Sequence, residues 1–368
     1  MLILNIDIYK ESKQLFDNHV LECKKKLKFN NNDIRYRRYK MDVKVRHSYR
    51  VVNNMKDIFN NLKINQSYIN LGKAVGILHD LGRFRQMLET GTYLDLSSFD
   101  SNSEIKDHAD YAVKILFDEK LIYQTRIDEK YFPVLYNAIK YHGKNKLPYC
   151  LTYKVNNIIG DFNKSSVDEF LSSCKQGDLQ YLKFLSIYAQ AIRDADKIDI
   201  YYQNLTNELP ITRPYFYCNP KRDSLNKIAK EFGLTEEEII RYNNLDSNDI
   251  SELELIKIPV ANMNINKLAI SDELIDLFMK NELLDFKVLV ENRGYNFITA
   301  TLVRLNFLRD INFVSTLISL KEKQILEKIY DMYPSEYKPL LSQVFRFAQD
   351  NLIDGVIKEN AGKIYIKK

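Results

Sequence analysis

Four of the five histidines recur at similar intervals in the first half of the chain: His47, His79, His108 and His142. The steps between them are 32, 29 and 34 residues. Asp80 directly follows His79, and a later carboxylate, Asp196, lies in the segment RDADKID. Imidazole nitrogens and carboxylate oxygens together are a usual ligand set for divalent transition metals. The spacing therefore predicts a metal site assembled from distant parts of the chain.

The adjacent pair His79 and Asp80 indicates how such a site would be arranged. Neighbouring residues on a helix diverge by about 100°, so the two side chains reach different sides of one site. We expect Asp80 to lie between two metal ions and to be central to catalysis. One ion would be completed by His79, His47 and Asp196, and the other by His108 and His142. Two ions about 3.5–4 Å apart would activate a bridging hydroxide and clamp a phosphoryl group.

Helices are the elements that must carry these side chains. Apolar residues follow the 3.6-residue period in five segments of the first two hundred residues: 51–63, 71–79, 103–118, 132–141 and 180–202. Helices of roughly 15–20 residues joined by short loops repeat on the same scale as the histidines. The loop 91–102 is rich in Gly, Ser, Asp and Asn. His19 has no acidic neighbour and is expected to be a structural residue.

Composition supports a mainly α-helical chain. Only 11 Gly and 8 Pro occur in 368 residues, which disfavours folds built on many tight turns. No apolar run reaches the roughly 18 residues that span a bilayer, and MLILNIDIYK lacks the basic start of a signal peptide. The four cysteines form no CxxC pair, so neither a disulfide scaffold nor a cysteine zinc site is expected. These features favour a cytoplasmic protein without a membrane partner.

The formal net charge of +5 is too small for a dedicated nucleic-acid binder. Basic residues do gather in RYRRYKMDVKVR at 35–46, just before His47. This segment is either a solvated helix face or an electropositive rim over an anionic substrate.

Five segments resemble the successive motifs of the HD-domain metal-dependent phosphohydrolases: HSYRV (47–51), ILHDLGRFRQ (77–86), DHADYAVKIL (107–116), NAIKYHGK (137–144) and AIRDADKIDIYY (191–202). The resemblance is closest to small bacterial HD proteins with HDxGRFxQ and RDADKxD motifs. It covers about 40–202, and 264–353 is similar to the C-terminal helices of that subfamily. It implies the ligands His47, His79, Asp80 and Asp196, with His108 and His142 marking a dinuclear member. Asp194 would be a supporting acid, although an assignment shifted to it stays open.

The resemblance implies one phosphate-binding side chain, and the spacing of nearby residues suggests three more. Arg83 takes the place of a lysine that follows the His-Asp pair in many HD enzymes, and an arginine fork suits a pair of phosphate oxygens. Arg50 lies one turn after His47, and Gln86 lies one turn after Arg83. Lys144 follows the last histidine after a glycine. We predict Arg50, Arg83, Gln86 and Lys144 to bind substrate, with Arg83 also catalytic.

A separate unit is predicted between about 215 and 260. A short strand at 215–217 precedes a helix that Asp223 or Ser224 caps and Gly233 closes. A capping box of Thr235 and Glu238 then opens a second helix, and LIKIP at 255–259 predicts a closing strand. This β-α-α-β order resembles a LysM module. The loops that bind glycans in such modules depart from the pattern, at 222–223 and 251–252, so sugar binding is a weak expectation.

The sequence thus predicts a mainly α fold, with an HD-type domain over 1–212 and 264–368 interrupted by a LysM-like α+β insertion at 213–263. Long amphipathic helices are expected between 270 and 355. The acidic start TEEEII of the second small helix argues against DNA reading, because phosphate would repel it.

The predicted function is metal-dependent hydrolysis of a phosphate ester or anhydride, in a small nucleotide-like substrate. One or two divalent ions are expected, Fe or Mn before Zn, Ni, Co or Mg. One alternative is a mixed-valent di-iron oxygenase of the same fold, which O₂ consumption would reveal. A second alternative is a non-catalytic protein that senses nucleotides or binds glycans.

Overall fold

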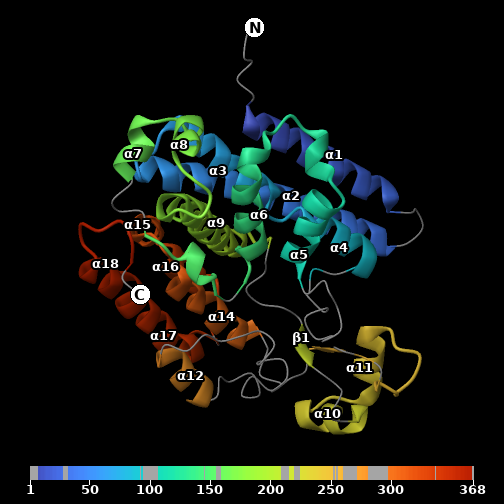
Figure 1. Ribbon diagram of the computed structural model, residues 1–368. Coiled ribbons are helices and arrows are strands. Elements are labelled where there is room, and N and C mark those ends of the chain that lie inside the picture. Colours follow the sequence, from blue (N-terminus) through green and yellow to red (C-terminus); the bar gives the residue numbers. More distant parts are fainter. Residues whose placement is uncertain are drawn as a thin grey trace. The chain divides into compact units, whose positions relative to one another are not determined.

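The fold is described from a computed structural model, whose elements are shown in Figure 1. The described residues are 7–27, 32–91, 93, 107–144, 146–154, 159–208, 215–218, 224–251, 253, 256–259, 272–280, 297–335 and 337–366. The chain divides into two compact units. The first unit comprises Met1–Ile200, Ile311–Thr316 and Gly362–Lys368, and the second comprises Tyr201–Asp310 and Leu317–Ala361.

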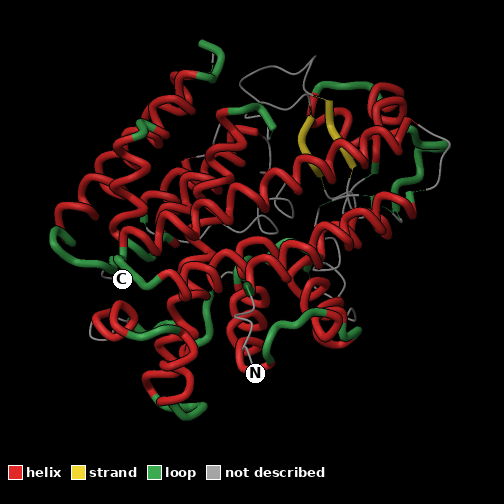
Figure 2. The backbone as a smooth tube through the Cα atoms, turned by 90° about the horizontal axis from the view of Figure 1, so that it is seen from above, coloured by secondary structure: helices red, strands yellow, loops and turns green. Residues whose placement is uncertain are grey.

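The described part of the first unit consists mainly of helices, which are red in the tube of Figure 2, joined by loops. Its α-helices are α1 (Ile8–Lys26), α2 (Asn32–Asn61), α3 (Gln66–Leu78), α4 (Gly82–Thr90), α5 (His108–Val113), α6 (Phe132–Tyr141), α7 (Ile159–Lys164), α8 (Val167–Ser173) and α9 (Leu179–Leu205). Short helical turns are η2 (Lys114–Asp118), η3 (Leu121–Gln124), η4 (Glu129–Tyr131) and η5 (Tyr149–Leu151).

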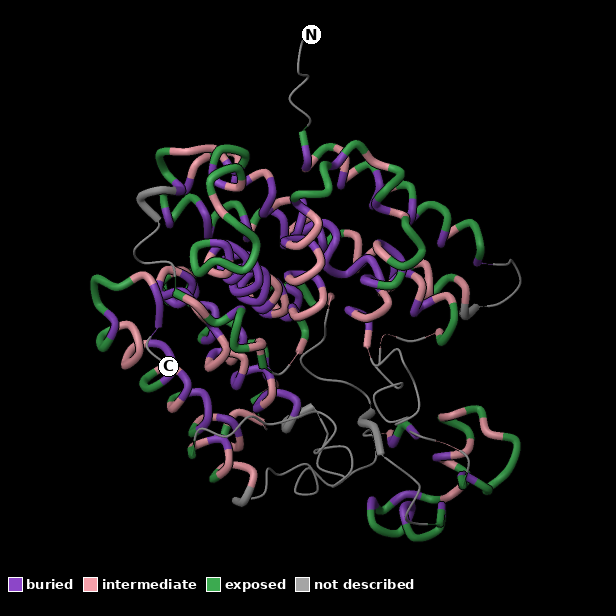
Figure 3. Tube along the Cα trace, in the orientation of Figure 1, coloured by how far each residue is buried: buried purple, intermediate pink, exposed green. Residues whose placement is uncertain are grey.

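The core of this unit gathers around α3 and α9. Apolar residues occupy almost every position of Leu71–Leu78, so α3 is buried along its second half. In α9 every residue from 184 to 195 is buried, visible as purple coils in Figure 3. A helix that is apolar on all sides must be enclosed by other helices. The metal-ligand candidates on these elements are therefore held by the best-packed part of the fold.

The predicted helices of the first unit are confirmed, with shifted ends. The segment 132–141 is α6 itself, 71–79 lies in α3, and 180–202 lies in α9. The segment 51–63 falls in the second half of α2, a 30-residue helix whose first half was not predicted. The predicted start of 103–118 and most of the loop 91–102 lie outside the described residues. In the described part, Asp107 caps α5 by accepting hydrogen bonds from two backbone amides.

Two short C-terminal segments belong to the first unit. Phe313 pairs with Tyr365 as an antiparallel bridge, the Val314 amide donates to the carbonyl of Ile364, and the Ile366 amide donates to that of Asn312, both at 3.0 Å. Phe313 and Tyr365 also join the core of this unit. The C-terminal segments therefore complete the domain that carries the histidines.

The second unit begins with the predicted β-α-α-β order. Strand β1 (Tyr215–Cys218) pairs antiparallel with β2 (Ile256–Pro259), and α10 (Leu225–Phe232) and α11 (Glu236–Asn243) lie between them in the chain. Ser224 caps α10, Gly233 ends it with a φ of 70°, and Thr235 and Glu238 form the predicted capping box. Isoleucines, leucines and a phenylalanine from these elements make a separate small core.

The remaining described helices of the second unit lie between residues 272 and 359. They are α12 (Asp272–Met279), α14 (Phe297–Asn306), η7 (Phe307–Asp310), α15 (Val314–Glu322), α16 (Ile325–Asp331), α17 (Lys338–Phe347), η8 (Ala348–Gly355) and α18 (Val356–Glu359). Each of these elements has 10 residues or fewer, but α17, η8 and α18 follow one another without a break, so residues 338–359 form one long helical run, as expected, and the described helices before it are short. Pro334 separates α16 from α17, and Pro339 stands in the first turn of α17, where a proline is compatible with a helix start. Within the described residues, no helix is long and apolar enough to cross a membrane.

Candidate metal centre

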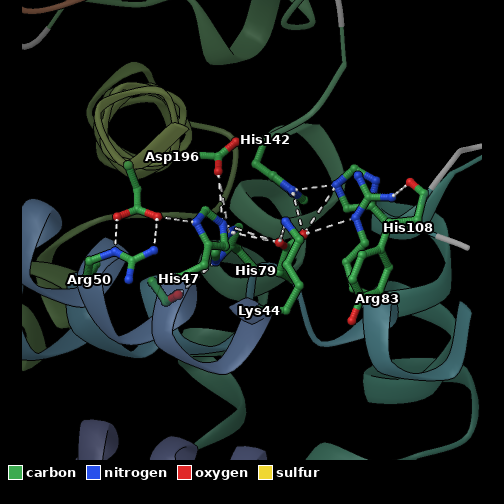
Figure 4. Close-up of polar contacts among 12 residues, drawn as sticks. Lys44, His47, Arg50, His79, Arg83, His108, His142 and Asp196 are labelled. Atoms are coloured by element: carbon green, nitrogen blue, oxygen red, sulfur yellow. Dashed lines mark hydrogen bonds and ion pairs between the residues drawn. The ribbon is translucent and has the colours of Figure 1, made fainter. Parts of the chain in front are cut away.

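The structure brings all six predicted ligands together inside the first unit (Figure 4). Each comes from a different place on the helices: His47 from α2, His79 from the end of α3, Asp80 from the turn before α4, His108 from the start of α5, His142 from the end of α6 and Asp196 from α9. All four histidines and Asp80 are buried. Buried ionisable groups that converge in this way are strong candidates for a functional site.

The first donor set consists of His47, His79, Asp196 and one oxygen of Asp80. The Nε2 atom of His47 lies 3.3 Å from Asp80 Oδ2 and 3.2 Å from Asp196 Oδ1. The Nε2 atom of His79 lies 3.8 Å from both of these oxygens and 3.2 Å from His47 Nε2. Four donor atoms therefore face one another.

The second donor set uses the other oxygen of the same carboxylate. Asp80 Oδ1 lies 3.4 Å from His108 Nε2 and 3.8 Å from His142 Nε2. The two imidazole nitrogens are 2.9 Å apart. The Asp80 carboxylate is thus the only one of the six side chains that contributes to both sets, one oxygen to each.

A close helix contact makes the second donor set possible. A β-carbon at Gly82 would lie 2.1 Å from the carbonyl oxygen of His108 and 2.5 Å from the Ala112 amide nitrogen. Any larger residue would push α5 away from α4, and with it the His108 ring. The glycine in the His-Asp-Leu-Gly sequence therefore sets the distance between His108 and Asp80.

Hydrogen bonds at Nδ1 orient three of the imidazole rings. His79 Nδ1 lies 2.8 Å from the carbonyl of Gly76, and His142 Nδ1 lies 2.7 Å from that of Ile139. Each ring donates from Nδ1, which leaves Nε2 directed to the centre. His47 Nδ1 instead lies 2.6 Å from a carboxylate oxygen of Asp199. Asp199 was not predicted, and it is a supporting partner of a kind that metal-ligating histidines usually have.

In the protein without metal, charges and hydrogen bonds within the first donor set shift the pKa values of its side chains. Burial alone would raise the pKa of Asp80, but the charges of Lys44 and His79 and hydrogen bonds from other histidines hold it well below its usual value. Burial would likewise raise the pKa of Asp196, and hydrogen bonds from His47 and His79 keep it well below the ordinary value. Burial would lower the pKa of His47, whereas hydrogen bonds with Asp196, Asp199 and Asp80 raise it to about 10.

Arg193 fixes the end of the helix that carries His142. Its Nη1 donates to the carbonyl oxygens of Tyr141 at 2.8 Å, His142 at 3.3 Å and Lys144 at 2.5 Å. A cation at a helix C-terminus satisfies carbonyls that lack partners within the helix. Arg193 is buried and lies on α9. This helix therefore supports the second donor set through Arg193 and contributes Asp196 to the first.

Asp194 does not belong to the centre. Its carboxylate accepts hydrogen bonds from the backbone amides of Asn312 and Phe313 and from the Asn312 side chain, at 2.9–3.1 Å. Burial raises its pKa. Asp194 therefore anchors the C-terminal segment 311–316, and Asp196 is the carboxylate of this motif that faces the histidines. Of the two carboxylates that the sequence left open, Asp196 is the one beside the histidines, and its role as a ligand stays a prediction.

The predicted substrate-binding residues surround the centre, and each is engaged by other side chains. Arg83 Nε lies 3.7 Å from Asp80 Oδ1, while its Nη1 donates to Gln86 Oε1 at 2.9 Å and to the carbonyl of Tyr93 at 2.6 Å. Of these residues, Arg83 is placed to meet a ligand beside Asp80. Gln86 is buried and holds the Arg83 guanidinium.

Arg50 and Lys144 have supporting contacts. Arg50 binds Asp199 through two hydrogen bonds, of 2.5 and 3.1 Å, and so stabilises the partner of His47. Lys144 Nζ lies 2.6 Å from Asp107, the residue that caps α5, and 3.1 Å from Asp110. Substrate binding by Arg50, Gln86 and Lys144 stays a prediction.

One cation at the centre was not predicted as a site residue. Lys44 Nζ lies 2.7 Å from Asp80 Oδ2, and Figure 4 shows its side chain reaching between the two groups of histidines. The sequence placed Lys44 only within the basic segment before His47. Its position three residues before His47 puts both on one helix face, which is the signal that would have found it.

The donor atoms fit a divalent transition metal. The centre offers imidazole nitrogens and carboxylate oxygens only, a mixture that suits Fe, Mn or Zn and lacks the all-oxygen character of a Mg²⁺ or Ca²⁺ site. The donor atoms described above for each half lie 2.9–3.8 Å from one another, close enough for one ion to contact several of them. Candidate metal-binding clusters are found at His47, His79 and Asp80 and at Asp80, His108 and His142.

Comparison with known protein families finds two domains in this chain. Residues 45–201 match the HD domain family, which is generally made of metal-dependent hydrolases, and residues 221–259 match the LysM domain. The chain therefore contains an HD domain and a LysM domain. No curated protein and no solved structure gives a significant match.

The two matches correct one detail of the predicted organisation. The HD match ends at residue 201, before the LysM match begins at 221. The LysM match thus follows the HD match in the chain and does not lie within it, although the C-terminal segments 311–316 and 362–368 group with the first unit. The prediction of an insertion came from the helices expected after residue 264, most of which group with the LysM domain in the second unit.

Proposed function

We propose that this protein is a dinuclear metal-dependent phosphohydrolase. The observation that carries the proposal is the division of the Asp80 carboxylate, with Oδ2 facing His47 at 3.3 Å and Oδ1 facing His108 at 3.4 Å. A carboxylate that offers one oxygen to each of two donor sets is suited to bridge two ions. His47, His79 and Asp196 would hold one ion with Asp80, and His108 and His142 the other. Iron or manganese suits this mixture of nitrogen and oxygen ligands.

Two ions bound here would supply a water-derived nucleophile at neutral pH and withdraw negative charge from a phosphoryl group. The chain's own residues position the reaction. Asp80 holds both halves of the centre in register, and Asp199 keeps the Nε2 of His47 directed inward. Arg83, whose guanidinium is held by Gln86 and by the Tyr93 carbonyl, neutralises a phosphoryl oxygen of the substrate.

The proposed substrate is a small phosphate ester or anhydride, of a nucleotide-like metabolite. The cations beside Asp80 favour an anionic ligand, and this supports a phosphohydrolase over an oxygenase of the same ligand pattern.

The experiment is a screen of phosphorylated metabolites with protein loaded with Mn²⁺ or Fe²⁺ under anaerobic conditions. We expect phosphate or pyrophosphate release without O₂. Asp80→Ala removes the shared carboxylate and is expected to lower turnover by more than about a thousandfold, because the transition-state stabilisation of the whole centre is lost. It is also expected to lose its metal in elemental analysis.

Asp57→Ala is the matched control, since Asp57 is exposed on α2 and should leave both metal and turnover unchanged. Full activity of Asp80→Ala would reject the proposal. Substrate-dependent O₂ consumption without anaerobic phosphate release would replace it by the oxygenase.

A further inference from the structure

Lys44 is placed where a metal ion would be expected to bind. Its Nζ lies 2.7 Å from Asp80 Oδ2, the oxygen that also faces His47 and His79. The Lys44 side chain is 18% exposed, so this ion pair is largely withdrawn from solvent. An ammonium group and a divalent cation at one carboxylate oxygen would repel each other strongly in such a site. The first donor set therefore holds a cation that belongs to the chain.

The surroundings of Lys44 offer its ammonium a second position. Lysine is a compact point charge on a flexible four-carbon stem, so it can exchange partners without movement of the helix. Its Nζ lies 5.9 Å from the centre of the Tyr93 ring, and the Arg83 guanidinium lies 6.0 Å from the same ring. The two cations thus share one aromatic neighbour, and they approach different oxygens of Asp80.

We propose that Lys44 is a tethered cation that competes with the first metal ion for Asp80 and, once displaced, binds the phosphoryl oxygens of the substrate beside Arg83. The phosphate role rests on the proposed function. In the metal-free protein the Lys44 ammonium is the cation nearest to Asp80 Oδ2, and together with the neighbouring histidines and Arg83 it offsets the cost of burying this carboxylate. In the metal-loaded protein the ion occupies the position next to Asp80, and the displaced Lys44 ammonium can then bind an anionic ligand.

The test combines two measurements on the full chain. In the first, Mn²⁺ is titrated into metal-depleted protein. Lys44→Met, which keeps the length of the stem and removes the charge, is expected to bind the first Mn²⁺ about tenfold more tightly, because the competing cation is gone. Lys56→Met is the control, since Lys56 is exposed further along α2 and should bind Mn²⁺ like the unmodified protein.

In the second measurement, inorganic phosphate is titrated into protein saturated with Mn²⁺. Lys44→Met is expected to bind phosphate about tenfold more weakly, whereas Lys44→Arg keeps the charge and stays within about threefold of the unmodified protein. Thermal unfolding checks that each variant is folded, and Lys44→Gln replaces Lys44→Met with the same expectations if the latter does not fold.

The outcomes separate the two claims. Unchanged Mn²⁺ affinity in Lys44→Met would overturn the competition with the metal. Unchanged phosphate affinity in Lys44→Met, with phosphate bound by the unmodified protein, would overturn the phosphate role of Lys44 and leave the proposed function in place. Absence of phosphate binding by the loaded, unmodified protein would overturn that role and count against the proposed function as well.

Discussion

The two donor sets share Asp80 but differ in charge. The first set also contains the carboxylate of Asp196, and Nδ1 of its His47 is hydrogen-bonded to a further carboxylate, that of Asp199. In the second set Nδ1 of His142 donates to a neutral backbone carbonyl, and the anionic donor next to the two histidines is an oxygen of Asp80. Because carboxylates near a divalent ion strengthen its binding and make the imidazole ligands more basic, the first set should bind its ion more tightly.

The difference shows that the residues behind the ligands add to an asymmetry that the ligand list already contains. Each set has two histidines and one oxygen of Asp80, and the sequence assigned Asp196 to the first set only. The supporting residues of the two sets differ as well. The first set is tied to α9 through Asp196 and Asp199, and the second depends on Arg193, which fixes the end of α6 through backbone carbonyls.

The largest expected effect concerns which ion survives dialysis. His47→Ala removes a ligand of the first set, and we expect its affinity to fall by more than about a hundredfold, since even the partners behind a ligand contribute 10–100-fold. After dialysis this variant should retain no ion. His108→Ala should still retain about one ion per chain, because the first set stays complete. Elemental analysis of both dialysed variants measures the difference.

His19→Gln serves as the control for these substitutions. His19 is buried beside Cys23, at 3.5 Å, on α1 and outside the metal centre. It should keep the metal content of the unmodified protein. Equal metal loss in His47→Ala and His108→Ala would contradict the prediction, because it would show that the two donor sets bind their ions with similar affinity.

A smaller effect is expected from pH. The pKa of His47 is raised to about 10 in the protein without metal, so at neutral pH this ring carries a proton that a metal must displace. Metal affinity of the first set should therefore rise with pH, by about tenfold per unit between roughly pH 7 and pH 9. The raised pKa of His47 also increases the free energy of unfolding of the metal-free protein. This contribution is fully present below the pKa that histidine has in the unfolded chain, about 6.5, and it is lost as the pH rises through about 10.

Calorimetric Mn²⁺ titrations in two buffers of different ionisation enthalpy measure the protons released with the first ion. We expect about one proton for His47 at neutral pH. An affinity that does not change with pH, with no proton released, would contradict this. His47→Ala provides the comparison, because the proton of that ring is then absent.

Much of the centre could be predicted because each of its ligands lies in a short ordered motif. The His-Asp pair and the regular spacing of the histidines point to helices that converge, and the structure brings all six residues together. The LysM elements could be predicted for a similar reason, since the Ser224 cap, Gly233 and the Thr235 capping box are local signals. Local signals survive folding because they act within one helical turn.

What the sequence did not predict depends on distant contacts. Asp199 is 152 positions from His47 in the chain, and Arg193 acts on carbonyls about 50 residues away. Asp199 does lie three residues after Asp196 in the RDADKID segment, which places both on one face of α9, but its contact with His47 appears only once the helices are packed. The first half of α2 was missed for a different reason. Its many Lys, Arg and Tyr residues hide the apolar period, although Met41 and Val43 are buried.

The smallest expected effect tests the carboxylate behind His47. Asp199→Asn keeps the size of the side chain and an oxygen that accepts from His47 Nδ1, but removes the negative charge that the first set has and the second lacks. We expect the first ion to bind about tenfold more weakly, at the lower end of the usual cost for such partners, because the loss of ligand basicity is offset in part by weaker proton competition at His47. The second ion should be unaffected. Mn²⁺ titration of Asp199→Asn beside Asp57→Asn, a charge removal on the exposed face of α2, measures both. An equal weakening of the two ions would mean that Asp199 supports the whole centre through Arg50 and the packing of α9, and the asymmetry between the donor sets would then rest on Asp196 alone.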